Sequence, residues 1–154
     1  MKRAKYLFKV EPYQHQRDTL RDSWDSIYYA LLLEMGTGKT KVALDTTGLL
    51  YEHERINAAL VIAPKGVYDN WIQGQIPDHL PDRIPRRVVR WSASKSKKSL
   101  TEITEITLNP FDGLKIFVMN VEAFSTVRGK EAAQKYLKKN PENITIVDES
   151  TTIK

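Results

Sequence analysis

The sequence predicts an α/β fold in which a mostly parallel sheet is flanked by helices. Short apolar runs, most of them rich in β-branched or aromatic residues, alternate with segments of helical pattern along the 154 residues. Strands that alternate with helices form parallel sheets covered on both faces. In addition, nearly all of the chemically distinctive stretches follow the ends of these runs. Ligands of parallel α/β sheets bind at the carboxyl ends of the strands, so a site is expected at that edge.

Five apolar runs are the predicted strands. Each is short and suits a buried strand. They comprise residues 28–33, 58–63, 88–91, 114–121 and 144–147.

Helical patterns precede and separate these strands. They lie at about residues 14–26, 39–53, 66–75, 99–108 and 130–140. The remaining irregular stretches, residues 75–87 with three prolines and the polar residues 92–99, are short and lie between apolar segments. Such stretches indicate connections within one domain rather than linkers between domains.

The composition is that of an ordinary soluble globular domain, with 41% hydrophobic and 28% charged residues. The sequence contains no cysteine, which excludes disulfides and cysteine-ligated metal. No apolar run is long enough to cross a membrane, and no signal-peptide pattern follows the first residues. We therefore expect a cytoplasmic protein. The formal net charge of +5 favours polyanionic partners, although only weakly.

The stretch EMGTGKT, residues 34–40, follows the first predicted strand and leads into a helix. Glycines let the backbone turn its N–H groups toward a phosphate, and the helix N-terminus adds partial positive charge. In such a loop Lys39 contacts the β- and γ-phosphates, and the Thr40 hydroxyl ligates Mg²⁺. The usual first glycine is replaced by Leu33, but Gly36 can supply the same freedom nearer the turn. The alternative is an ordinary glycine-rich turn between a strand and a helix.

Two adjacent acids, Asp148 and Glu149, end the last predicted strand. In phosphoanhydride hydrolysis one carboxylate at a strand tip holds the Mg²⁺ shell, and a neighbouring carboxylate polarises the attacking water. Asp148 suits the first role and Glu149 suits the second. Taken alone, two acids at a strand end indicate only a solvated terminus. Together with the phosphate-binding loop they predict a catalytic pair.

Four motifs, in order along the chain, resemble those of the first RecA-like lobe of superfamily 2 helicases and translocases. The similarity is greatest to the short phage and bacterial members of the Swi/Snf-like group. PYQHQRDTL (12–20) resembles the Q motif, and LLLEMGTGKT resembles motif I, in which the first glycine is commonly absent. LVIAPKGVYDNW (60–71) resembles motif Ia, and IVDESTTIK resembles motif II. IFVMNVEAF (116–124) also resembles motif Ib.

The resemblance implies roles for individual residues. A glutamine of the Q motif reads adenine through its amide, which has a donor and an acceptor. Gln14 and Gln16 are the candidates, and Gln16 is preferred because Leu20 lies one helical turn further on. Either glutamine could instead be a solvated residue at a helix start. The implied ATP-binding residues are Gln16, Gln14, Met35, Gly36, Thr37, Gly38, Lys39 and Thr40.

Motifs Ia and Ib imply a nucleic-acid contact through Lys65 and Asn120. The alternative for Lys65 is an ordinary surface lysine. Trp71 is predicted to pack in the core beneath motif Ia rather than to stack on a base. The three histidines have no metal-ligand spacing and are expected to be structural or surface residues.

The function implied by the resemblance is that of an ATP-dependent DNA helicase or translocase, with ATP and Mg²⁺ as cofactors and double-stranded DNA as partner. Two alternatives remain open from the residues. The first is a nucleotide-binding switch or a small-molecule phosphotransferase with a phosphate-binding loop. The second is a nucleic-acid-binding module without catalysis.

The chain ends five residues after Glu149. We therefore expect residues 1–154 to form an incomplete N-terminal RecA-like lobe, truncated after motif II, that lacks the second lobe and is almost inactive alone. In the family, the motif III strand lies between the strands of motifs I and II. Without it, those two strands could close up, a second copy could fill the gap, or the last segment could pack poorly. Self-association or poor packing is the expected outcome.

Overall fold

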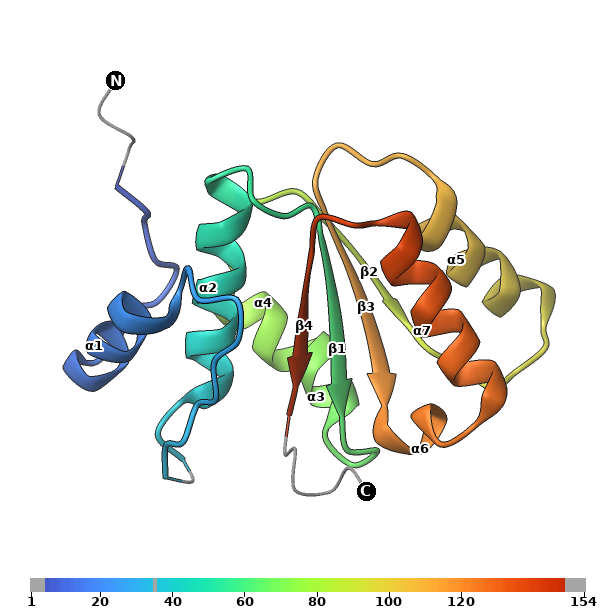
Figure 1. The fold of residues 1–154 in the computed structure, drawn as a ribbon, viewed down its shortest axis with the longest axis horizontal. Coiled ribbons are helices and arrows are strands. Elements are labelled where there is room, and N and C mark those ends of the chain that lie inside the picture. Colours follow the sequence, from blue (N-terminus) through green and yellow to red (C-terminus); the bar gives the residue numbers. More distant parts are fainter. Residues whose placement is uncertain (1–4, 35, 149–154) are drawn as a thin grey trace.

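The computed structural model describes residues 5–34 and 36–148. Four parallel strands form its sheet in the order β2-β3-β1-β4 (Figure 1). The strands are β1 (Ala58–Ala63), β2 (Arg86–Arg90), β3 (Leu114–Asn120) and β4 (Asn143–Val147). The predicted α/β class, with a parallel sheet flanked by helices, is confirmed, and so are four of the five predicted strands.

The helices lie close to the predicted positions. They are α1 (Gln14–Ser23), α2 (Lys39–Glu52), α3 (Tyr68–Asn70), the π-helical turn η1 (Trp71–Gln75), α4 (Ile76–His79), α5 (Lys97–Leu108), α6 (Val121–Phe124) and α7 (Val127–Lys139). The helix expected at 66–75 is thus a series of three helical segments that continues to His79. Side-chain caps fix three of the helix starts, because Ser96 accepts from the Ser99 N–H, Asn120 from the Ala123 N–H and Thr126 from the Gly129 N–H. None of the helices in the described ranges is long and apolar enough to cross a membrane.

The central strand β1 is buried along its whole length because helices cover both of its faces. Ala59, Val61 and Ala63 belong to the core beneath α2, η1 and α4. Ala58, Leu60 and Ile62 alternate with them and belong to the core beneath α5 and α7. That core also contains Phe117. The two helical layers lie on either side of the sheet in Figure 1.

The expected strand at 28–33 is wrong. Residues 25–34 form no strand, and the side chains of Ile27, Tyr28 and Leu32 are 88%, 93% and 92% exposed. Backbone N–H and C=O groups of a strand require a neighbouring strand. Strand β4 pairs with β1 alone, so within the described residues no strand lies beyond it for this segment to join. The two strands that were expected to flank the gap have therefore not closed up.

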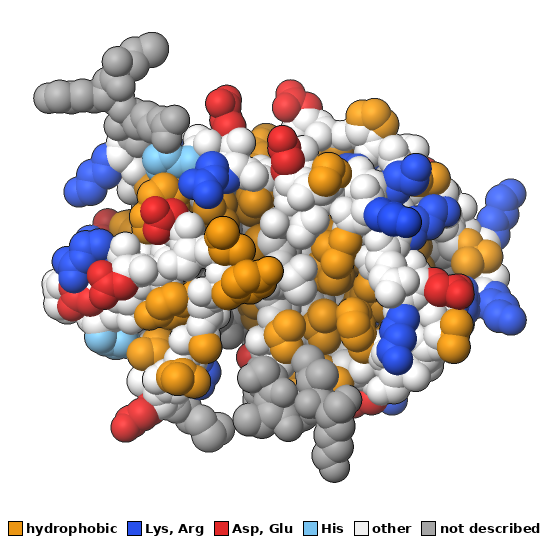
Figure 2. Space-filling model, in the orientation of Figure 1, with side chains coloured by type: hydrophobic (Ala, Val, Ile, Leu, Met, Phe, Trp, Pro, Cys, Tyr) orange, Lys and Arg blue, Asp and Glu red, His pale blue; other side chains and the backbone are white. Residues whose placement is uncertain are grey.

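This side of the molecule carries apolar surface. Val147 on β4 is 40% exposed, in addition to the three side chains of the 25–34 segment. Figure 2 shows hydrophobic side chains on this face, and Lys and Arg side chains concentrated toward the side formed by α5 and α7. The apolar surface agrees with an incompletely covered sheet edge at β4.

Candidate functional site

The glycine loop before α2 is placed at the carboxyl edge of the sheet. The strands all point toward the same end of the molecule, and α2 begins at that end (Figure 1). Gly36 and Gly38 have φ angles of 78° and 85°, a left-handed conformation that glycine adopts without strain. Gly38 is the N-cap of α2, and Lys39 and Thr40 form its first turn. The free N–H groups and the partial positive charge of this helix end therefore face the edge where a ligand is expected.

Lys39 is folded back along its own loop. Its Nζ donates to the carbonyl oxygen of Leu33 at 2.9 Å, and the side chain is half-buried. Thr37 adds a second bond within the loop, because its Oγ1 donates to the Glu34 carbonyl at 2.6 Å. An anionic oxygen would be a stronger acceptor for the ammonium than the Leu33 carbonyl is. The lysine is thus positioned to exchange a backbone acceptor for a phosphate oxygen.

Gln16 joins α1 to this loop. Its side chain is 4% exposed, its Nε2 donates to the Thr37 carbonyl at 3.0 Å, and its Oε1 accepts from the Tyr13 N–H at 2.9 Å. A Cβ atom built on Gly38 would lie 2.2 Å from Gln16 Nε2. The structure therefore brings Gln16 to the predicted loop. Each amide atom retains capacity for one further hydrogen bond, because Nε2 has a second N–H and Oε1 a second lone pair.

The two residues before Gln16 behave differently from each other. Gln14 is exposed, and its Nε2 donates to Asp18 Oδ1 at 3.0 Å along the helix surface. The structure therefore does not bring Gln14 to the loop. His15 does reach it, because its Nε2 lies 3.0 Å from the Thr37 carbonyl oxygen. Sequence reasoning missed this contact, although the position of His15 next to Gln16 is a signal that could have found it.

Asp148 is positioned by two elements. Its N–H donates to the Ile62 carbonyl at 2.8 Å, which continues the β1–β4 ladder. Its Oδ2 accepts from Trp71 Nε1 at 2.9 Å. Trp71 is 1% exposed, so the prediction that it packs in the core is confirmed. Its hydrogen bond to Asp148, which links the predicted motifs Ia and II, could not be predicted from the spacing in the sequence.

Two predicted site residues, Met35 and Glu149, lie outside the described residues. The roles expected for them in nucleotide binding and as general base therefore stay predictions.

Lys65 and Asn120 lie at the carboxyl ends of two neighbouring strands, at the same edge of the sheet. Lys65 is exposed just beyond β1. Asn120 ends β3, and its Oδ1 accepts from the Ala123 N–H at 2.7 Å as the cap of α6. Asn120 therefore has a structural role that the sequence did not reveal, while its amide nitrogen has no partner within the described residues.

A buried ion pair lies one turn into α2, below the glycine loop. Lys41 Nζ is 2.7 Å from Asp45 Oδ2, and the two side chains are 7% and 1% exposed. The ammonium also lies 5.5 Å from the centre of the Phe8 ring. Burial raises the pKa of Asp45 to about 6, although the hydrogen bond and charge of Lys41 oppose that shift. Sequence reasoning missed this pair, for which the only signal was the i, i+4 spacing of opposite charges.

Comparison with known proteins adds no family to this geometry. No protein-family model matches the chain, and no curated protein matches it.

Proposed function

We propose that this chain is the ATP-binding motor lobe of an ATP-dependent DNA helicase or translocase of the Swi/Snf-like type. The observation that supports the proposal most strongly is the clamped loop at the start of α2. Two left-handed glycines precede the helix, Lys39 folds over the loop, and Gln16 from α1 packs against Gly38. A phosphate-binding loop requires this combination of backbone freedom, positive charge and a rigid support.

Mg·ATP would supply the phosphoanhydride bond whose hydrolysis drives a motor of this type. Mg²⁺ is commonly held by one or two protein groups together with substrate phosphates. The Thr40 hydroxyl and the Asp148 carboxylate fit that donor set, and the indole of Trp71 holds Asp148 in orientation. Lys39 would bind phosphate oxygens in place of the Leu33 carbonyl. Glu149 remains the proposed general base, since it follows Asp148 directly.

The adenine and nucleic-acid sides of the proposal depend on the sequence motifs. Gln16 is the preferred adenine-reading residue because it is the glutamine that contacts the loop. Lys65 and Asn120 are the proposed contacts to double-stranded DNA, since both lie at the carboxyl edge of the sheet. Hydrolysis is expected from the complete motor rather than from this lobe alone.

Calorimetric titration with Mg·ATP tests the nucleotide part of the proposal. Lys39→Ala is expected to weaken binding by at least tenfold, because charge-assisted bonds to phosphate are among the strongest that a side chain makes. Lys65→Ala is the matched control, since it removes the same charge at the same edge but outside the loop, and it should bind normally. Equal binding by wild type and Lys39→Ala would overturn the assignment of the loop.

A further inference from the structure

The carbonyl group of Thr37 joins the glycine loop to α1. It is approached by two side chains of that helix, because Gln16 Nε2 donates to it at 3.0 Å and His15 Nε2 lies 3.0 Å from it. A carbonyl oxygen can only accept, so His15 Nε2 carries the hydrogen of the second bond. The His15 side chain is exposed, whereas that of Gln16 is buried. The proposed function uses Gln16 but assigns no role to His15.

The Thr37 carbonyl belongs to the peptide group that leads into α2. In a planar trans peptide the C=O and N–H bonds point in opposite directions. A carbonyl directed at α1 therefore turns the Gly38 N–H away from α1. That N–H has no partner within the described residues. It precedes the first turn of α2, whose own N–H groups have no partner within the helix.

This peptide group needs support from outside the loop. Thr37 lies between Gly36 and Gly38, whose φ angles are 78° and 85°, and glycine adopts many other backbone angles at little cost. Helix α2 fixes only the far side of Gly38, whose carbonyl accepts from the Val42 N–H at 3.1 Å. Rotation of the Thr37–Gly38 peptide would present a carbonyl oxygen, instead of an N–H, to a bound phosphate. The bonds from α1 oppose that rotation.

His15 is well placed to supply one of these bonds. Its ring stacks on the Tyr13 ring, with the ring centres 6.0 Å apart and the planes at 15° to each other. The amide of Gln16 has a second proposed task, which is to read adenine, and turning toward a base would weaken its bond to the Thr37 carbonyl. The His15 ring has no other hydrogen bond within the described residues, so its bond to Thr37 is free of that competition.

We infer that His15 is a positioning residue of the glycine loop. It holds the Thr37–Gly38 peptide so that the Gly38 N–H is turned toward a bound phosphate, and it acts through the Thr37 carbonyl without touching the nucleotide. The identity of the anion rests on the proposed function. The effect of His15 on the peptide group is a property of the free protein, so it is tested separately.

The first test follows the carbonyl ¹³C signal of Thr37 and the amide ¹⁵N signal of Gly38 in the free protein. His15→Phe keeps an aromatic ring for Tyr13 but removes the donor. The Thr37 carbonyl signal should move upfield, because carbonyl carbons do so when they lose a hydrogen bond. Relaxation dispersion at the Gly38 amide should increase, because the peptide then samples both orientations. Unchanged signals in His15→Phe would overturn the inference.

Two further replacements separate the donor from a general structural effect. His15→Gln places an amide N–H near the position of Nε2 and should restore both signals, whereas the shorter side chain of His15→Asn should not. Arg21→Ala changes an exposed position of the same helix and is the control. If His15→Asn restores the signals as well as His15→Gln does, the Nε2 donor is not what positions the loop. If the variants lower the free energy of unfolding without changing either signal, His15 has only a structural role. Either result would overturn the inference.

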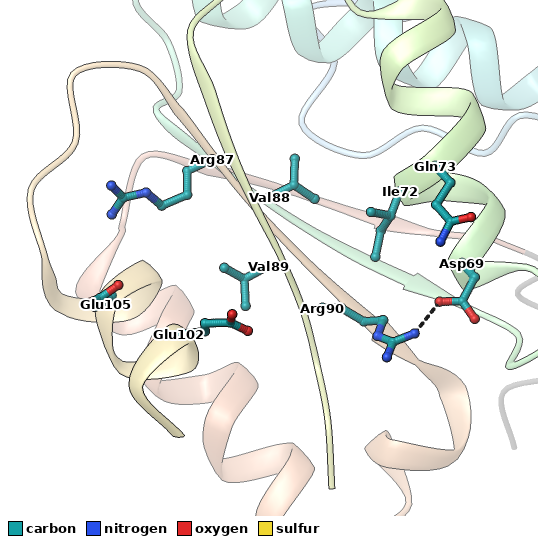
Figure 3. A pocket seen from close by; sticks show the side chains of 9 residues that line it. All are labelled: Asp69, Ile72, Gln73, Arg87, Val88, Val89, Arg90, Glu102 and Glu105. Carbon is teal, nitrogen blue, oxygen red and sulfur yellow. Dashed lines mark hydrogen bonds and ion pairs between the residues drawn. The ribbon is translucent and has the colours of Figure 1, made fainter. Parts of the chain in front are cut away.

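A pocket of about 570 Å³ along the β2 edge provides reference signals (Figure 3). Its lining includes no residue of the glycine loop or of α1, and it carries charges of both signs. Arg90 Nη1 lies 2.6 Å from Asp69 Oδ1 in this pocket. The amides of Val88 and Val89, on β2, should stay unchanged in every His15 variant. Equal changes there and at Gly38 would indicate a general disturbance of the fold and would overturn the inference.

Calorimetry with Mg·ATP measures the consequence for binding. Because one neutral hydrogen bond is lost, His15→Phe should weaken affinity about fivefold. His15→Gln should bind nearly as wild type does, and Arg21→Ala should bind normally. Equal affinity of wild type and His15→Phe would overturn the inference. Absence of binding by wild type would instead overturn the proposed function, and the signals of the free protein would still decide whether His15 holds the peptide.

Discussion

Single residues decide the shape of the glycine loop, and Gly38 is the clearest case. Its φ of +85° disfavours any side chain, and a Cβ there would also approach Gln16 Nε2 to 2.2 Å. Gly36 has a similar φ of +78° but nothing within 4 Å of an added Cβ. The two glycines therefore separate backbone strain from side-chain collision.

Gly36→Ala should lower the free energy of unfolding by ~1–2 kcal/mol, the usual cost of a left-handed alanine. Gly38→Ala should cost more, because the Gln16 amide must also move. Denaturant unfolding of both variants measures the difference. In a Gln16→Ala background the excess cost at Gly38 should disappear. Equal costs at the two glycines in the wild-type background would show that the Gln16 contact does not constrain the loop.

The buried carboxyl group of Asp45 should make the stability of the fold depend on pH. Its folded-state pKa of about 6 lies above the ordinary value of 3.8, chiefly because burial disfavours the charged form. The folded state therefore binds the proton more tightly than the unfolded state does. The resulting stabilisation is complete below the unfolded pKa and is lost as the pH rises through the folded pKa.

Between about pH 4 and pH 6, wild type should lose up to about 3 kcal/mol of stability relative to Asp45→Asn, at ~1.4 kcal/mol for each pKa unit. Denaturant unfolding at a series of pH values measures this difference. A constant difference between wild type and Asp45→Asn across this window would contradict the raised pKa.

At the scale of elements, the hydrogen bond from Trp71 to Asp148 couples η1 to the end of β4. Trp71→Phe should keep the buried aromatic packing but remove the indole donor. A hydrogen bond to a charged group typically contributes ~1.5–3 kcal/mol. A double-mutant cycle with Asp148→Ala, which removes the acceptor, should therefore give a clear coupling free energy of unfolding. If the two single effects simply add, the bond contributes nothing to the position of Asp148.

Elements also show how far the sequence could predict the fold. The apolar runs that became β1 and β3 lie between other strands, so local pattern and tertiary context agree. The run at 28–33 has the same local pattern. A segment can be a strand only where another strand lies beside it to pair with, and the local pattern of a sequence does not show whether such a strand is present. The Trp71–Asp148 bond likewise depends on a contact between elements, whereas the Asn120 cap of α6 is a local bond between residues three apart.

At the scale of the whole molecule, the parallel topology gathers the predicted site residues at one edge. Three strands end at this edge, and α2 begins there (Figure 1). Lys65 follows the end of β1, Asn120 ends β3, Asp148 follows β4, and Lys39 begins α2. That gathering was predictable, because right-handed parallel α/β units direct all strand ends the same way. The sequence predicted Gln16 as part of a motif, but it did not predict that its side chain contacts the glycine loop. Self-association through the β4 edge stays a prediction.

The loop between Leu33 and Thr40 is proposed to bind the phosphates of ATP. An amide NMR titration of the ¹⁵N-labelled chain with Mg·ATP tests it most directly. The backbone amides of Gly36, Gly38, Lys39 and Thr40 should shift together, and the side-chain amide of Gln16 should shift with them because it bonds to the Thr37 carbonyl. Unchanged signals at these positions in the presence of saturating Mg·ATP, or shifts confined to another surface, would show that this loop does not bind the nucleotide.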